Sequence, residues 1–433
     1  MAVVVAVLMV IAIVWPKRPS AAAIALDAKI AQLRADGVPL TALEIAKILP
    51  DPDADHDAHN VLRDAFNAPR GPAGGDIPIV AGGTMPKRTE PFPDSTMQSM
   101  QLHLSYSDAM LEKIPGQLDG VWFSMGWTNG FTNLVRFPIL EMRNLIQTLA
   151  VKALFEAERG NGNKAAEALG RGFSAAGTLY NESLVSAMIR VAGAGVMCDA
   201  AERTINRATL RDGELLELER RINVERIDGF EHTFMVERHM GMLVFDPARR
   251  GRDFFNDSAI KHLVWKLKQW VRGEKKKFYR DEDYLLFLNT VDERRSAHGL
   301  AGLARIRRHE LLDTYYVTNT QSLVAEMVMP SWRKAMRTAT ETKARLIALK
   351  AALAVERYRL AHSNALPDTL DVLVPQYLPS PPRDPMDEQP LRFKKLSRGY
   401  VLYSIGADGI DNGGVERGGL TNNYDVTITV ERE

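Results

Sequence analysis

The chain has little of several features that would narrow its function at once. It contains one cysteine, Cys198, in 433 residues, which excludes an internal disulfide framework and any metal site built from several cysteines. Its formal net charge is +1, which argues against the strongly basic surface that neutralises phosphates in nucleic-acid-binding proteins. We therefore expect no nucleic-acid partner. Cys198 stands in an apolar stretch with helical spacing, and we interpret it as a buried core residue.

Standard catalytic signatures are also missing from the sequence. There is no Gly-x-Ser-x-Gly elbow, no Walker loop and no His-Glu-x-x-His motif. The letters of Gly170–Ala175 fit a dinucleotide fingerprint, but no strand precedes them and the surrounding pattern predicts a helix. The sequence therefore assigns no catalytic residue, no cofactor-binding residue and no small-molecule substrate.

The first fifteen residues, Met1 to Trp15, carry no charge, glycine or proline. As a helix they would span about 22 Å, short of the roughly 30 Å hydrocarbon core of a bilayer. Lys17 and Arg18 follow the apolar run, and no basic residue precedes it. We interpret residues 1–20 as a membrane anchor. The alternatives are an anchor whose basic start is lost and a signal peptide cleaved near Ala21–Ala23, so the orientation stays open.

Composition and periodicity divide the rest of the chain into three parts. Residues 21–96 predict short helices and a linker rich in proline and glycine, residues 97–332 an α-helical domain, and residues 333–433 a smaller α+β module. The expected fold class is mainly α, with an N-terminal membrane helix, an α-helical hairpin body and a C-terminal long helix followed by a small antiparallel sheet.

The clearest hairpin of the body lies around residues 145–205. Helices are predicted up to Arg159, over Lys164–Leu179 and over Ser183–Ile205, with small residues such as Ala168 and Gly172 at their contact. This pattern resembles tetratricopeptide-type hairpins, which present a groove to a protein partner. Further helices are predicted over 212–224, 227–244 and 281–308.

Three polar clusters invite a functional reading. His56 and His59 lie among aspartates just before a predicted helix, where we favour helix capping over metal binding. Glu231, His232, Glu237 and His239 are the candidates for an alternative, a hydrolase-type enzyme with its site in the helical domain. Lys261 to Arg280 is basic and aromatic, and predicts, as a further alternative, a peripheral membrane-binding protein.

The last hundred residues carry the most specific order of residue types. A helix is predicted from Thr338 to His362, with Asn364 as a left-handed cap and Pro367 blocking its continuation. Residues 391–394 and 400–404 predict a β-hairpin, and strict alternation over 425–430 predicts a third strand.

This order closely resembles the soluble domain of the major pseudopilins of type II secretion systems. The resemblance rests on Leu366-Pro367 with Leu370, on Asp384-Pro385, and on Tyr400-Val-Leu-Tyr-Ser-Ile-Gly-Ala-Asp-Gly409. The whole chain also looks like a group of bacterial envelope proteins that combine an N-terminal anchor with a helical middle. The resemblance implies the bacterial inner membrane as location, with the body in the periplasm.

The pseudopilin loop after the second strand holds a calcium ion. The resemblance therefore implies Asp408 and Asp425 as carboxylate ligands, with Asp411 or Asn412 and nearby carbonyls completing an oxygen shell. Ordinary Asx turns are the alternative for the same residues.

Because about 330 residues precede this module, it is expected to be a borrowed module and not a fibre subunit. The leading hypothesis is a non-enzymatic, membrane-anchored scaffold or partner-binding protein of the cell envelope. It is held by its N-terminal segment, binds a protein partner and has a link to type II secretion-like assemblies.

Overall fold

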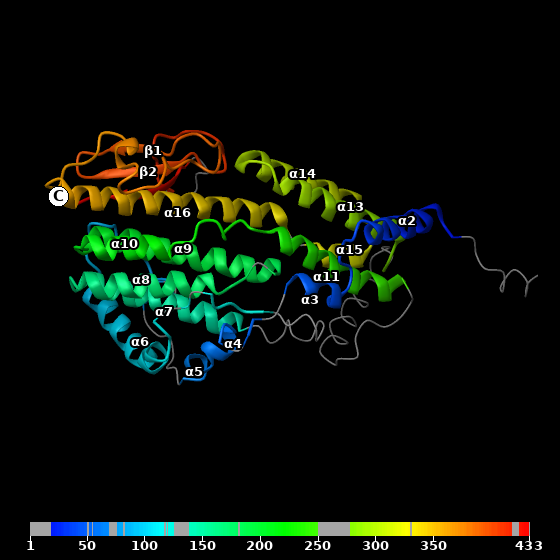
Figure 1. Ribbon diagram of the computed structural model, residues 1–433, viewed down its shortest axis with the longest axis horizontal. Coiled ribbons are helices and arrows are strands. Elements are labelled where there is room, and N and C mark those ends of the chain that lie inside the picture. The colour runs from blue at the N-terminus through cyan, green and yellow to red at the C-terminus, as the bar shows by residue number, and fades with distance from the viewer. Residues whose placement is uncertain are drawn as a thin grey trace, which may run out of the picture. The chain divides into compact units, whose positions relative to one another are not determined.

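The computed structural model describes residues 19–49, 52–53, 55–68, 76–80, 83–116, 118, 120–124, 138–180, 182–249, 278–329, 331–417 and 424–432. These residues are mainly helical, with one small antiparallel sheet among them (Figure 1). The described helices are α2 (Ala21–Ala35), α3 (Ala42–Ile48), α4 (Ala58–Val61), α5 (Arg63–Phe66), α6 (Asp94–Glu112), α7 (Ile139–Glu158), α8 (Gly162–Gly177), α9 (Leu184–Arg207), α10 (Asp212–Arg221), α11 (Glu231–Arg249), α13 (Asp281–His298), α14 (Gly302–Asn319), α15 (Leu323–Val328) and α16 (Trp332–Ala361).

The chain folds into two compact units. The first contains residues 1–40, 238–293 and 314–330, and the second contains 41–237, 294–313 and 331–433. In the first unit the buried Arg238 forms an ion pair with Asp292, whose other carboxylate oxygen lies 2.7 Å from Lys29 Nζ of α2. Phe245 of α11 stacks on Tyr284 of α13 with ring centroids 4.5 Å apart. Polar pairing and aromatic stacking together hold α2, α11 and α13.

Helices α7, α8 and α9 form the core of the second unit, and small residues let them approach closely. A Cβ on Gly172 of α8 would lie 2.4 Å from Met197 of α9, and one on Gly193 of α9 would lie 2.9 Å from Ile146 of α7. The predicted hairpin is confirmed, and the N-cap of the next helix, α9, is Ser183.

One prediction in the body was wrong: residues 281–308 do not form a single helix. Helix α13 ends at His298, and α14 begins at Gly302. The Leu303 amide donates to the carbonyl oxygen of Met386 at 3.0 Å, and a Cβ on Gly302 would lie 2.0 Å from the Pro385 carbonyl oxygen. The backbone of Pro385 and Met386 therefore takes the amide that would otherwise continue the helix. Only glycine fits at position 302 beside it.

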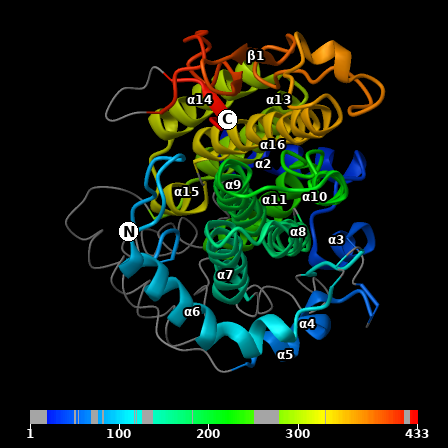
Figure 2. The same cartoon turned by 90° about the vertical axis from the view of Figure 1, so that its left-hand side faces the viewer.

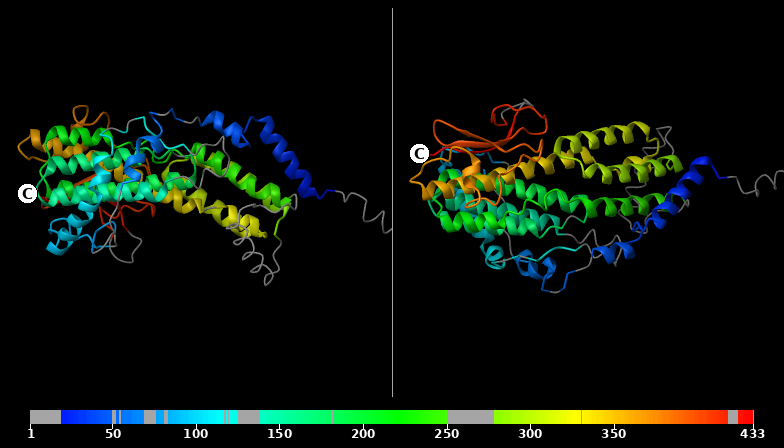
Figure 3. Two further views of the ribbon diagram at one scale, coloured as in Figure 1. Left: turned by 90° about the horizontal axis from the view of Figure 1, so that it is seen from below. Right: turned by 45° about the horizontal axis from the view of Figure 1, so that its top comes forward.

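Helix α16 connects the helical body to the sheet. It packs against α9 and α10 as well as β2 and β3 (Figure 2). Its alanines from Ala335 to Ala354 are buried. Strands β1 (Arg392–Lys395), β2 (Tyr400–Ser404) and β3 (Val426–Val430) lie along it in the order β1-β2-β3 (Figure 3). The predicted long helix, hairpin and third strand are confirmed, although the helix begins six residues earlier than expected, at Trp332.

The sheet is antiparallel throughout, and its register aligns three residues across the strands. Leu402 of β2 stands opposite Phe393 of β1 and Ile428 of β3. Gly399 makes the tight turn between β1 and β2 possible, because it has φ +91° and any Cβ would lie 1.8 Å from the Val430 carbonyl oxygen.

A buried carboxylate, Glu356 of α16, ties the helix to the sheet and to the end of the chain. It accepts hydrogen bonds from Tyr400 Oη at 3.0 Å and Arg359 Nη1 at 3.1 Å, and pairs with Arg432. Removing one partner of such a buried network leaves uncompensated charges inside the protein.

The expected membrane anchor over residues 1–20 lies almost wholly outside the described residues. Within the described part of the chain, α9 is the one helix long and apolar enough to cross a membrane. However, α9 is mostly buried among α7, α8 and α16. Its composition is therefore explained by packing in the core of the second unit.

We predict that Glu356→Ala lowers the free energy of unfolding by about 3–5 kcal/mol, because it leaves Arg359 and Arg432 unpaired. Glu341→Ala on the same helix is the matched control. Glu341 forms a partly exposed pair with Arg337 at 2.9 Å, so its loss should cost at most about 1 kcal/mol. Urea denaturation followed by circular dichroism measures both values. Equal values for the two variants would contradict this role of Glu356.

Candidate functional site

Three of the four residues proposed for calcium lie close together. Asp408 and Asn412 belong to the C-terminal loop, residues 405–417, and Asp425 precedes β3. The Asn412 amide donates to Asp425 Oδ1 at 3.2 Å, and the Asn412 side-chain amide donates to Asp408 Oδ2 at 3.3 Å. Asp425 also accepts from the Gly414 amide at 2.7 Å. Burial raises the pKa of the Asp425 carboxyl above its ordinary value, although the two amides lower it.

Asp411, the fourth candidate, is engaged elsewhere. Its Oδ1 accepts from the Gly413 amide at 2.9 Å, and its Oδ2 lies 3.6 Å from Arg392 Nε. Within the described ranges no group of three or more His, Cys, Asp or Glu side chains is arranged to hold a metal. A calcium site in this loop would therefore use two carboxylates, Asp408 and Asp425, together with amide and carbonyl oxygens.

Asp384, in the Asp-Pro pair, is the centre of the module. It is fully buried and accepts hydrogen bonds from Ser404 Oγ at 2.6 Å, the Ile405 amide at 3.0 Å and the Met386 amide at 2.9 Å. Arg392 Nη1 lies 2.6 Å from Asp384 Oδ2, the oxygen that also accepts from the Ile405 amide. Two motifs far apart in the sequence, Asp384-Pro385 and Tyr403-Ser404, are thus joined by one carboxylate.

The acid and histidine candidates of α11 are directed to separate structural tasks. His232 stacks on Tyr180, and Glu237 accepts from the Leu184 amide at 3.0 Å, at the N-terminus of α9. Burial raises the pKa of the Glu237 carboxyl. His239 is buried, and its Nδ1 lies 2.9 Å from the Leu40 carbonyl oxygen. Glu237 thus satisfies an amide at a helix N-terminus, and His239 contacts a loop carbonyl.

Capping near His56 and His59 is confirmed. Asp57 accepts from the His59 amide at 2.9 Å as the N-cap of α4, and Asp53 accepts from the amide and the ring of His56. Of the basic segment Lys261 to Arg280, only Phe278, Tyr279 and Arg280 are among the described residues. The proposed membrane-binding surface otherwise lies outside them.

A buried aromatic cluster in the second unit contains two histidines, His298 and His309. Phe234 stacks on Trp332 at 4.4 Å, and His309 stacks on both, with ring centroids 6.1 Å away. His309 Nδ1 lies 3.4 Å from Arg294 Nη1. Burial, together with the positive charge of Arg294, lowers the pKa of His309 to about 3. This ring is therefore neutral in the folded protein at ordinary pH.

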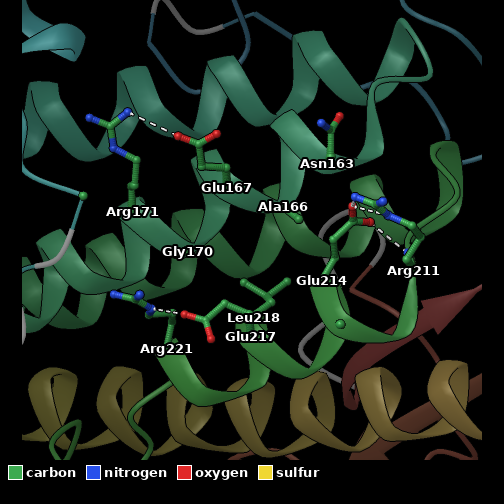
Figure 4. Close-up of a pocket in the computed structure, with 12 residues that line it drawn as sticks. Asn163, Ala166, Glu167, Gly170, Arg171, Arg211, Glu214, Glu217, Leu218 and Arg221 are labelled. Atoms are coloured by element: carbon green, nitrogen blue, oxygen red, sulfur yellow. Dashed lines mark hydrogen bonds and ion pairs between the residues drawn. The ribbon is translucent and has the colours of Figure 1, made fainter.

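The sequence did not indicate a groove that lies between α8 and α10, called here the α8–α10 groove (Figure 4). It has a volume of about 520 Å³, within the range of ligand-binding clefts. Its lining residues are Gly116, Asn163, Ala166, Glu167, Gly170, Arg171, Arg211, Gly213, Glu214, Glu217, Leu218 and Arg221. Small apolar residues form the floor, and charged residues form the rim.

The two walls of the groove run in the same direction. At one end a Cβ on Gly162 of α8 would lie 2.1 Å from the Thr209 carbonyl oxygen, just before α10. At the other end Arg221 Nη1 of α10 lies 3.4 Å from Ser174 Oγ of α8. Equivalent turns of α8 and α10 therefore face each other.

Charges alternate along this groove because each wall carries an acid and a base one turn apart. Arg171 lies 3.8 Å from Glu167 on α8, and Arg221 lies 2.8 Å from Glu217 on α10. Figure 4 places Arg171 and Arg221 together at one end, with Glu167 and Glu217 next to them. The rim is thus banded, with a positive band followed by a negative one.

A second cleft, of about 430 Å³, lies between α9, α16 and β3. Its charges satisfy one another: Arg345 pairs with Asp199 at 2.7 Å and with Glu202 at 3.4 Å. Glu202 Oε1 also accepts from the Thr429 amide at 3.0 Å, on the outer edge of β3. Burial raises the pKa of the Glu202 carboxyl, and Arg345 opposes this effect. These groups therefore serve mainly to hold β3 against α9.

Comparisons with known proteins give no match. No family model, no curated protein and no solved structure is significantly similar to this chain.

We predict a pH dependence of stability from His309. Unfolding frees this histidine to take up a proton below its ordinary pKa of 6.5, whereas the folded protein resists protonation down to about pH 3. Its contribution to stability is complete above pH 6.5 and falls by about 1.4 kcal/mol for each pH unit below it.

The unfolding free energy of the wild type, measured by denaturation from pH 7 to 4.5, should fall more steeply than that of His309→Gln. His362→Gln, an exposed histidine, should keep the wild-type slope. A wild-type slope in His309→Gln would contradict this origin.

Proposed function

We propose that this protein is a non-enzymatic scaffold of the bacterial cell envelope, anchored by its N-terminal segment, that binds a protein partner in the α8–α10 groove. The groove carries this proposal, because it combines a volume of about 520 Å³, a floor of small apolar residues and a charged rim. Helical hairpins expose such surfaces to partners without further chemistry.

The contacts of the candidate catalytic residues favour a scaffold over an enzyme. General acid–base catalysis needs an acid and a base that reach one substrate. Glu237 instead caps α9, and the His239 ring contacts a backbone carbonyl. These tasks account for both side chains structurally.

The attachment of the C-terminal module favours a scaffold over a fibre subunit. The outer edge of β3 is covered by α9, where Glu202 accepts from the Thr429 amide and Asn206 Nδ2 donates to the Thr429 carbonyl oxygen at 2.9 Å. Asn206 Oδ1 accepts from the Glu431 amide at 2.7 Å. Side chains thus replace the strand that would otherwise add to this edge.

The location and the link to secretion rest on the pseudopilin resemblance. Its motif residues Asp384 and Ser404 meet through a 2.6 Å hydrogen bond, which gives a physical reason for their joint presence. A protein with this module, placed in the inner membrane with its body in the periplasm, would contact type II secretion-like assemblies.

We predict that a photo-crosslinking amino acid at Gly213, on the rim of the groove, captures one defined envelope protein in living cells. A Cβ at Gly213 meets no atom within 4 Å, so the probe fits without distortion. The same probe at Val185, which is 55% exposed outside the groove lining, is the control and should not give this product. Mass spectrometry identifies the product.

Gly170→Trp should abolish this crosslink by filling the groove. The Cβ of the new residue would lie at an ordinary 3.6 Å from Arg221 Cγ, and an unchanged melting temperature would show that the fold is intact. Capture of a cytosolic protein, no defined product, or a product unaffected by Gly170→Trp would each overturn the proposal.

We further propose that the C-terminal loop binds calcium through Asp408, Asp425 and Asn412. The side-chain amide of Asn412 now donates to Asp408 and to the Ile410 carbonyl oxygen at 3.0 Å. Rotating this amide by half a turn would place Asn412 Oδ1 beside Asp408 Oδ2 and the Ile410 carbonyl oxygen. A cation between these three oxygens would stabilise that arrangement.

We predict that calcium raises the melting temperature of the full chain by several degrees relative to a chelator. A difference of 1 kcal/mol corresponds to about 2–4 °C for domains of this size. Asp408→Ala and Asp425→Ala should each remove the shift, whereas Asp411→Ala should keep it, since Asp411 bonds elsewhere. If calcium gives no shift, or if Asp411→Ala alone removes it, the three-residue site is wrong.

A further inference from the structure

We propose that the occupant of the α8–α10 groove is an amphipathic α-helix of a partner protein, with a lysine or arginine one helical turn from an aspartate or glutamate. This inference rests on the proposed function and specifies the chemistry of the partner. It follows from the shape of the groove, from the backbone groups of its occupant and from the order of charges on its rim.

The walls of the groove favour a helix over an extended segment. Both walls are helices, α8 and α10, and past the first turn of each helix their backbone groups are bonded within the helix. An extended segment buried along the groove would find few backbone partners, and unpaired backbone groups are costly away from water. A helix satisfies its own backbone and needs only side-chain contacts.

The floor of the groove permits close helix packing. Ala166 and Gly170 lie one turn apart on α8, and Leu218 faces them from α10. Small residues on one wall let a third helix approach at the usual 8–10 Å between axes. The floor therefore matches an apolar stripe of alanine- and leucine-sized side chains.

The banded rim specifies the charges of the partner. Arg171 and Arg221 attract an acidic residue, and Glu167 and Glu217 attract a basic residue one turn away. Glu167 and Glu217 are 70% and 52% exposed, so their present ion pairs are weak and are readily shared with a third charge. Arg171 and Arg221 are only 21% and 16% exposed. Arg171 also donates to the carbonyl oxygens of Leu111 and Ile114 at 2.7 and 2.9 Å, which fixes its guanidinium at the positive band.

The test uses a display library of 20-residue helical peptides, selected against the full-length protein. Each peptide has a fixed apolar stripe of Ala and Leu, and its flanking positions vary among Glu, Lys, Ser and Gln. Peptides selected on the wild type should share an acid and a base one turn apart, and Gly170→Trp should abolish their binding. Fluorescence anisotropy of synthetic copies gives the dissociation constants.

A paired exchange on α10 tests the order of charges. Glu217→Arg combined with Arg221→Glu keeps the net charge and the one-turn ion pair. It places each charge on α10 opposite a charge of the other sign on α8, so that neither band remains. The exchange should raise the dissociation constants of the selected peptides about tenfold. Arg333→Glu with Glu310→Arg is the matched control, since it exchanges an exposed 3.0 Å ion pair outside the groove lining. This control should leave binding unchanged, and melting curves check the fold of both variants.

Two results would overturn the inference. Peptides that share no charge order, or that bind the α10 exchange variant as tightly as the wild type, would show that charge does not select the partner. Selection of peptides that do not form helices would exclude a helical occupant. Either result leaves the proposed function standing if the Gly213 crosslink is captured, whereas loss of the crosslink removes the proposed function itself.

Discussion

The second unit depends on the burial of one long helix, α16, on two sides at once. Its alanines pack against α9 and α10, and the strands β2 and β3 cover it as well. Alanine offers little apolar area per residue, so the neighbouring helices and strands have to pack close to α16. Polar groups enclosed by this packing have to be paired. Glu356 with Tyr400, Arg359 and Arg432, and Glu202 with Thr429, provide that pairing.

This constraint accounts for the closed edge of the C-terminal sheet. An open sheet edge pairs readily with other chains. Here Glu202 and Asn206 of α9 bond to the backbone of β3. The same side chains that satisfy the buried strand prevent its extension. The module is thereby part of the second unit, and the groove remains as the surface through which we propose that the protein binds a partner.

Several titratable residues of the second unit have structural contacts. Asp57 caps α4, Glu237 accepts from the first amide of α9, and His309 is neutral in an aromatic cluster. Each is held by contacts that need only its shape and its hydrogen bonds. The rim of the α8–α10 groove differs, because its ion pairs are partly exposed and lie within single helices. Such pairs cost little to exchange, and this property suits binding better than stability.

The sequence by itself determined the local structure: the hairpin of α7 and α8, the helices α9 and α16, the helix capping ahead of His59 and the three strands. These follow from periodicity, capping and turn chemistry, which act over a few residues. The tertiary structure alone decided the break before Gly302, where Met386 takes the Leu303 amide, and the approach of Arg392 to Asp411. It also created the groove, since Arg171 and Arg221 are fifty residues apart in sequence. Their shared band exists because α8 and α10 run in the same direction, a geometry that no local pattern encodes.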